Sequence, residues 1–169
     1  GAQEPVLDQQ QRATLAAIPL ITGDLPEGYQ FAGEGFLDAD QAAGPGIEPA
    51  ALGDAGFGGM YLSVYQNASN GGLVTSYVSA WTDAAAAEDG FALLEDEAVT
   101  SPGADVSDAE LEAGTGSAEL TTGTVDADGT TRAIADATFV TDRYIVGVSV
   151  ETAQDGAMDA AGMQALVDT

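Results

Sequence analysis

The chain has 169 residues, 28 of them acidic against three arginines, and it contains no lysine, histidine or cysteine, so its formal net charge is -25. Nucleic acid and anionic membrane surfaces are excluded as partners, because both are bound through clustered Lys and Arg. Without His, Cys or Lys the chain also lacks the side chains for a Ser-His-Asp triad, a thiol nucleophile, a His-ligated zinc site, a Schiff base or a Walker A loop, and we expect no enzyme.

In chain order, the first half predicts a helix and then three strands. Leu7, Leu15 and Ile18 stand at near-helical spacing before Pro19, which predicts a short helix over 8–18. The strands are expected at 29–37, 57–65 and 73–81, with a Gly- and Pro-rich loop over 38–56 and an Asn- and Gly-rich turn over 66–72.

The acidic, alanine-rich segment that follows predicts a longer helix over 83–97. Asp83 is a candidate N-cap, because a side-chain oxygen there can accept a hydrogen bond from the first helical turn. Ala87, Phe91 and Leu94 lie at the spacing of one buried helical face. We therefore expect this helix to pack on the preceding strands.

The second half repeats this order of strands and a helix. Ser107 and Glu110 form a candidate capping box, which predicts a single helical turn at 108–112. Strands are expected at 116–125, 131–140 and 144–151. Asp155 is the candidate N-cap of a last helix with Met158, Ala161, Met163, Leu166 and Val167 on its apolar side.

The two halves, about 20–97 and 113–169, predict one α+β domain that spans residues 1–169, with residues 1–7 as a flexible tail. A three-stranded sheet with one helix leaves strand edges and one sheet face uncovered. Two such β-β-β-α halves side by side form a sheet of about six mostly antiparallel strands with the helices packed on it. We expect the halves to share a common core.

The last two strands also predict their own register. If Asp142 and Arg143 form the turn, the cross-strand pairs are Phe139 with Val146, Ala137 with Val148, and Ala135 with Val150, all on one face. That face is expected beneath a helix. The reverse face carries a mixture of apolar and polar side chains, namely Arg132, Ile134, Asp136 and Thr138 opposite Ile145, Gly147, Ser149 and Glu151.

Aromatic and cationic side chains are the candidates for ligand binding. Tyr61, Tyr65, Tyr77 and Trp81 share strand parity in the first hairpin, so they form either a pocket for an apolar or sugar-like ligand or plain core beneath the helix over 83–97. Arg132 and Arg143 can each clamp an anionic ligand. Their other interpretation is an ion pair with a neighbour such as Asp136 or Asp142.

The carboxylates offer only weak signals for a metal or an active site. Asp126 and Asp128 precede Gly129 as half of a calcium loop would, but Ala137 stands where a full loop requires Glu, so an Asp-Gly hairpin turn is the alternative to weak Ca²⁺ binding. A pair of carboxylates suited to glycoside hydrolysis arises almost automatically among 28 acids. We expect no other cofactor.

The acidity has a consequence for the protein's surroundings. With 45% hydrophobic residues the chain has enough material for a folded core beneath its charges. Salt screens the repulsion between carboxylates, since the Debye length falls to about 3 Å at 1 M ionic strength. The composition is therefore typical of a protein adapted to saline surroundings or of an acidic exported protein.

Three segments carry a resemblance to a known type of protein: WTDAAAAEDGFALLEDE (81–97), TRAIADATFVTDRYIVGVSVE (131–151) and DGAMDAAGMQALVDT (155–169). Together they resemble small prokaryotic secreted or lipoprotein-type α+β domains of unknown function. The resemblance implies an extracytoplasmic sensor or ligand-binding module and includes no catalytic residue. The polar start GAQEPVLDQQQ is similar to the spacer after a cleaved or lipid-anchored N-terminus, and no transmembrane segment is expected in the chain.

These observations lead to one expected function and leave two others open. We expect a non-catalytic extracytoplasmic module, secreted or membrane-anchored, that binds a small ligand or a partner protein. A calcium-dependent adhesion or structural module is the second reading, and a carboxylate-based hydrolase is the third.

Overall fold

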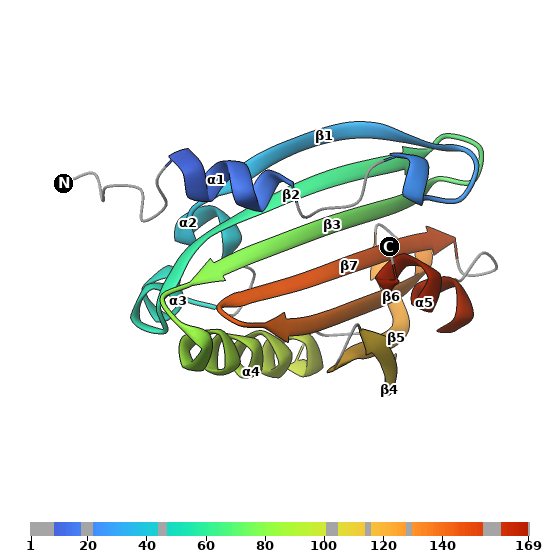
Figure 1. Ribbon diagram of the computed structural model, residues 1–169. Coiled ribbons are helices and arrows are strands. Elements are labelled where there is room, and N and C mark those ends of the chain that lie inside the picture. The colour runs from blue at the N-terminus through green and yellow to red at the C-terminus, as the bar shows by residue number, and fades with distance from the viewer. Residues whose placement is uncertain are drawn as a thin grey trace.

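The structure, a computed structural model, describes residues 9–17, 22–43, 47–100, 105–113, 116–127, 130–153 and 160–168. It confirms the predicted α+β class, with an antiparallel sheet and helices packed on it (Figure 1). The elements are α1 (Gln9–Ala16), η1 (Thr22–Asp24), β1 (Tyr29–Leu37), α2 (Ala39–Ala42), α3 (Pro49–Asp54), β2 (Phe57–Asn67), β3 (Gly72–Trp81), α4 (Ala84–Thr100), β4 (Asp105–Ala113), β5 (Gly116–Ala127), β6 (Thr130–Thr141), β7 (Tyr144–Ala153) and α5 (Ala160–Val167).

The strands form a single sheet in the order β1-β2-β3-β7-β6-β5-β4. Each half contributes a meander, and the halves meet where β3 pairs antiparallel with β7, for example Val78 with Val146. Both hairpins therefore belong to one sheet, as predicted. The predicted register of the second hairpin is also confirmed, because Phe139 pairs with Val146 and Ala137 with Val148.

Two predicted segments differ from the structure. Residues 108–112 form no helical turn but lie in β4, a seventh strand that pairs with β5 along its whole length. The expected loop over 38–56 contains α2 and α3. Helix α2 begins with a capping box between Asp38 and Gln41, which stabilises its first turn. Helix α3 has no side-chain cap but begins with Pro49, whose fixed φ suits the first turn of a helix.

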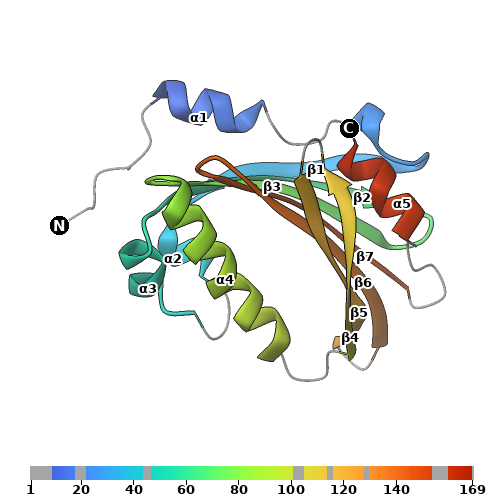
Figure 2. The ribbon, with the colours of Figure 1, turned by 60° about the horizontal axis from the view of Figure 1, so that its bottom comes forward.

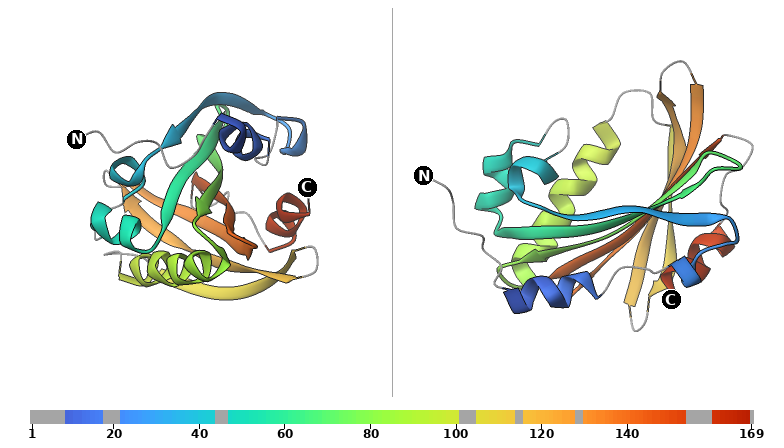
Figure 3. Two further views of the ribbon diagram at one scale, coloured as in Figure 1. Left: turned by 60° about the vertical axis from the view of Figure 1, so that its left-hand side comes forward. Right: turned by 90° about the horizontal axis from the view of Figure 1, so that it is seen from above.

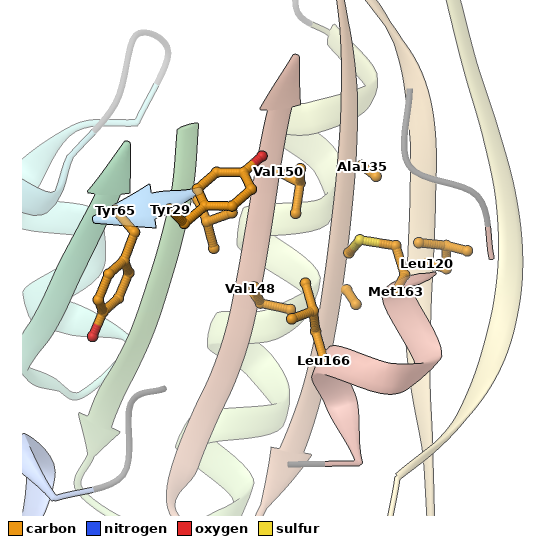
Figure 4. Close-up of a cluster of buried hydrophobic side chains, with 10 residues drawn as sticks. Tyr29, Tyr65, Leu120, Ala135, Val148, Val150, Met163 and Leu166 are labelled. Atoms are coloured by element: carbon orange, nitrogen blue, oxygen red, sulfur yellow. The ribbon is translucent and has the colours of Figure 1, made fainter. Parts of the chain in front are cut away.

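One face of the sheet, here called the covered face, lies beneath α1 and α5 (Figure 2). Leu15 of α1 packs against Tyr61 and Val78. Met163 and Leu166 of α5 point toward the sheet and contact the pairs that β6 and β7 present there, which include Val148 and Val150 (Figure 4). The second hairpin thus lies under a helix on the predicted side.

Among the described residues, α2, α3 and α4 pack on the opposite face, around Trp81 (Figure 3). Trp81 and Ile145 are buried there against Ala87 of α4. Asp83 caps α4 as predicted, because its carboxylate accepts a hydrogen bond from the backbone N–H of Ala86 at 2.9 Å. The core is therefore divided by the sheet into parts on both faces, whereas the sequence predicted one common core.

Candidate functional site

The opposite face also carries side chains of mixed chemistry outside the hydrophobic cluster beneath α4, and we call this group the mixed patch. Its side chains are neither fully buried nor fully exposed, and none of its apolar members belongs to the hydrophobic clusters of the described residues. The patch consists of Leu62 and Val64 from β2, Leu73, Thr75 and Tyr77 from β3, Ile134, Asp136 and Thr138 from β6, and Ser149 from β7.

Asp136 is the centre of a hydrogen-bonded group in this patch. The hydroxyl of Thr138 donates to Asp136 Oδ1 at 2.7 Å, and the Ser149 side chain hydrogen-bonds to the same carboxyl group. The phenol of Tyr77 lies 3.2 Å from Asp136 Oδ1 and 2.9 Å from Thr138 Oγ1. Because the Thr138 hydroxyl donates its proton to Asp136, it can only accept a hydrogen bond from Tyr77. The Tyr77 phenol is therefore the donor in the hydrogen bond between Tyr77 and Thr138.

Burial changes the ionisation of both acidic groups in this cluster. Loss of hydration raises the pKa of Asp136, and the hydrogen bonds from Thr138, Tyr77 and Ser149 oppose that rise. Burial, reinforced by the nearby negative charge of Asp136, raises the pKa of Tyr77 well above its ordinary value. Tyr77 therefore keeps its proton throughout the physiological range and remains a hydrogen-bond donor.

An ion pair borders the patch at the end away from α4. Arg132 Nε lies 2.6 Å from Glu151 Oε1. The same guanidinium donates from Nη2 to the backbone carbonyl of Gly71, in the turn between β2 and β3, at 2.8 Å. Arg132 thus ties the first hairpin to the second, and its charge is already matched by a carboxylate.

The predicted aromatic face is divided between the two sides of the sheet, which corrects the sequence interpretation. Tyr61 pairs with Val78, so Tyr77 and Trp81 must point to the side opposite Tyr61 and Tyr65. Tyr61 and Tyr65 are buried on the covered face. Burial, together with donation of its hydroxyl proton to Glu34, raises the pKa of Tyr61 to about 12.

The remaining aromatic candidates have different surroundings. Trp81 is only 2% exposed beneath α4, and its indole N–H donates to Ser79 Oγ at 2.9 Å, so it is core as the alternative interpretation expected. Tyr77 is the aromatic side chain of the predicted set that lies in the mixed patch.

The two candidate arginines lie at opposite ends of the second hairpin. Arg132 forms its ion pair with Glu151 rather than with Asp136 or Asp142. Arg143 lies in the turn between β6 and β7, with its guanidinium 5.4 Å from the centre of the Tyr144 ring. Anion binding by either arginine stays a prediction, while the alternative of an ion pair holds for Arg132 with a different carboxylate from those expected.

The candidate calcium loop lies only partly within the described residues. Asp126 is in β5, where it pairs with Thr131, whereas Asp128 lies outside the described residues. Among the residues that the structure describes, no three acidic side chains gather in a way that could hold a metal ion. Calcium binding remains a prediction.

Part of the mixed patch could be found from sequence and part could not. The alternation in β6 and β7 already placed Asp136, Thr138 and Ser149 on one mixed face. Leu62, Val64, Leu73 and Thr75 were not singled out, although they alternate with buried residues along β2 and β3. The alternation along each strand, combined with the correct cross-strand pairing, would have placed them on the same face as Asp136.

The fold has a counterpart among solved structures. The chain is similar to the extracellular domain of PknH from Mycobacterium tuberculosis, with a TM-score of 0.55 and 14% sequence identity over 98% of this chain and 95% of that one. At this identity the likeness shows a shared fold. Neither a protein-family model nor a curated protein sequence matches the chain. No helix in the described part is long and apolar enough to cross a membrane.

Proposed function

We propose that this protein is a non-catalytic, extracytoplasmic sensor-type module that binds a small ligand on the mixed patch. The observation that carries this proposal is the patch itself, in which half-buried apolar side chains surround a few polar groups held in fixed positions. Small-molecule sites combine these two features, since apolar contacts supply affinity and a few oriented polar groups supply specificity.

The fold likeness supports the extracytoplasmic part of this proposal. The related structure is an extracellular domain, and it matches this chain along nearly its whole length. The acidic composition is compatible with such surroundings, where salt screens repulsion between carboxylates. The position of Asp136, which engages three hydroxyls in hydrogen bonds, supports a binding role over a catalytic one.

A fragment screen by two-dimensional NMR tests the binding role. The screen contains small alkyl amines, alkyl acids, sugars and amino acids, and we expect the protein to bind some of these classes more tightly than others. The backbone amide signals that a binding fragment shifts are expected to cluster around Tyr77, Asp136 and Ser149. Shifts confined to the covered face, or no saturable binder in any of these classes, would contradict the proposal.

A blocking variant and a matched control sharpen the screen. Thr75→Phe adds a large side chain at the middle of the mixed patch, and we expect it to abolish binding of the fragments that the wild-type protein binds. Ala92→Phe adds the same side chain at an exposed position of α4 and is expected to leave binding unchanged. Equal binding by both variants would place the ligand elsewhere.

A further inference from the structure

We infer that the ligand of the mixed patch is a primary organic ammonium ion with a short aliphatic chain. This inference rests on the proposed function and specifies the chemistry that the same site recognises. Three independent features of the patch lead to this inference. They are the hydrogen-bond acceptors of its polar cluster that no internal hydrogen bond uses, the charge around that cluster, and the apolar side chains beside it.

The polar cluster offers acceptors and no spare donor. The hydroxyl protons of Thr138 and Ser149 are directed to Asp136, and that of Tyr77 is shared between Thr138 and Asp136. An ionised carboxylate has about four acceptor positions, so these hydrogen bonds leave about one of them, in addition to the lone pairs of the Tyr77 phenol. A ligand group that enters the cluster must therefore donate hydrogen bonds, as an ammonium does with its three N–H groups.

The charge around the cluster selects a cation among possible donors. On this face the described parts of β5, β6 and β7 carry Glu119, Asp136 and Glu151, and Arg132 is the cation opposing them. The Arg132 charge is matched by Glu151. The Asp136 carboxylate, whose hydrogen-bond partners are neutral hydroxyls, and the net charge of -25 attract a cation and repel an anionic ligand.

The apolar members of the patch suit the carbon chain of such a ligand. Leu62 and Val64 lie on neighbouring positions of β2 facing the patch, with Leu73 on β3 and Ile134 on β6. Each is partly exposed and outside the hydrophobic clusters of the described residues. Burying methylene groups against them increases affinity about fourfold per CH₂.

A second copy of this protein is a poor occupant of the same surface. Two molecules of net charge -25 repel each other, and the patch of each copy carries the Asp136 carboxylate. Like charges brought together at an interface oppose association. A small cation meets the opposite situation, since both the local and the overall field attract it.

Three probes with the same six-carbon chain test the inference on the wild-type protein: hexylammonium, 1-hexanol and hexanoate. NMR titrations at about 0.15 M salt, where surface charges are largely screened, measure affinity and locate each probe. We expect hexylammonium to bind saturably at Tyr77, Asp136 and Ser149, about tenfold or more tighter than 1-hexanol, as expected for a charge-assisted hydrogen bond. Hexanoate is expected not to bind there.

Two isosteric variants separate the cluster from general acidity. Asp136→Asn removes the charge and turns one acceptor into a donor, and we expect it to weaken hexylammonium binding about tenfold or more. Asp40→Asn removes one exposed carboxylate from α2 and is expected to leave binding unchanged. Circular dichroism melts of both variants report whether each is folded. If a variant does not fold, the titrations of the three probes on the wild-type protein still test the inference.

Each outcome decides between the class of ligand and the binding role. If hexanoate or 1-hexanol binds the patch as tightly as hexylammonium, the ammonium assignment is wrong while a binding role for the patch stands. If hexylammonium instead shifts residues scattered over the acidic surface, or binds Asp136→Asn as well as Asp40→Asn, the assignment is wrong. If none of the three probes binds at the patch, the ammonium assignment is wrong, and the binding role of the patch is then decided by the fragment screen alone.

Discussion

Gly147 shows how closely single residues set the geometry of the mixed patch. It lies on β7 beside Tyr77 of β3, and a Cβ at this position would overlap the Tyr77 ring. The phenol can reach Asp136 and Thr138 because the position between the strands carries no side chain. A glycine within a strand here serves close approach rather than a turn.

Replacing Gly147 tests this arrangement. We expect Gly147→Ala to reduce the free energy of unfolding by about 1–3 kcal/mol, the usual cost of overpacking, and to displace Tyr77 from Asp136. Gly35→Ala in β1 is the control, because a Cβ there meets no atom within 4 Å. Urea denaturation compares both variants with the wild-type protein, and an equal stability of the two would show that Tyr77 does not depend on the gap.

Asp136 predicts a pH dependence of stability with a definite sign. Its pKa is raised in the folded state, so the folded protein binds this proton more tightly than the unfolded chain does. Its contribution to stability is therefore fully present below the unfolded pKa of about 3.9 and is lost as the pH rises through the folded value. The titratable groups that face it are the neutral phenol of Tyr77 and the charged side chains of Glu119, Arg132 and Glu151.

The measurement compares variants, because the many other carboxylates also titrate. The free energy of unfolding of Asp136→Asn, relative to wild type, is expected to increase as the pH rises from about 4 toward 7, since the variant has no carboxylate to ionise there. A pH-independent difference for Asp136→Asn would mean that its folded pKa is not raised.

At the scale of elements, the contact between α4 and the sheet depends on a glycine within the helix. Gly90 is buried against the ring of Trp81, and a Cβ there would overlap that ring. Glycine lowers helix stability by about 1 kcal/mol relative to alanine, yet here it lets the helix approach the sheet. Packing and helix propensity therefore favour opposite residues at this position.

The competition can be measured with two substitutions of the same kind. Gly90→Ala is expected to destabilise the protein by about 1–3 kcal/mol, because overpacking against Trp81 exceeds the gain in propensity. Gly53→Ala in α3, where a Cβ meets no atom within 4 Å, is expected to be neutral or stabilising. Thermal unfolding followed by Trp81 fluorescence compares them, and stabilisation by Gly90→Ala would show that α4 does not pack tightly.

The strands were largely predictable because they alternate and because their turns are short. The second hairpin was placed in register from its two-residue turn, in which Asp142 has φ 52, a conformation that Asp tolerates. Strand β4 was missed because Ser107 and Glu110 resemble a capping box, and only pairing with β5 decides for a strand. Helix α2 was missed since its four residues are too few to show a period.

The site was less predictable than the fold, because it depends on pairing between distant strands. Asp136 and Thr138 were correctly placed on one face from local alternation. Tyr77 joins them only because β3 pairs with β7, and its hydrogen-bond partner Asp136 lies 59 residues away in the sequence. The error that grouped Tyr77 with Tyr61 arose from a parity count along the chain, whereas the cross-strand pair of Tyr77 is Leu62.

At the scale of the whole molecule, charge repulsion predicts that salt stabilises the fold. With three arginines against 28 acidic residues, the arginines can neutralise only a minority of the carboxylates. Salt screens that repulsion, which is stronger in the compact state, while it weakens few attractive pairs. Burial of the sheet faces is unaffected by this screening.

We therefore expect the melting temperature to rise steadily as sodium chloride is increased from about 0.05 M toward 1 M, over which the Debye length falls to about 3 Å. Differential scanning calorimetry measures the rise, and sucrose at equal osmolality serves as a control for general solute effects. A melting temperature that is constant or falls with salt would show that the acidic surface does not limit stability.

The helices nearest the two ends of the chain, α1 and α5, both pack on the covered face (Figure 2). The strand pairing places the mixed patch on the reverse side of the same sheet. A solid support or a fused partner attached through either helix would therefore be on the covered face. Immobilisation through α1 or α5 is expected to leave the mixed patch free to bind small molecules from solution.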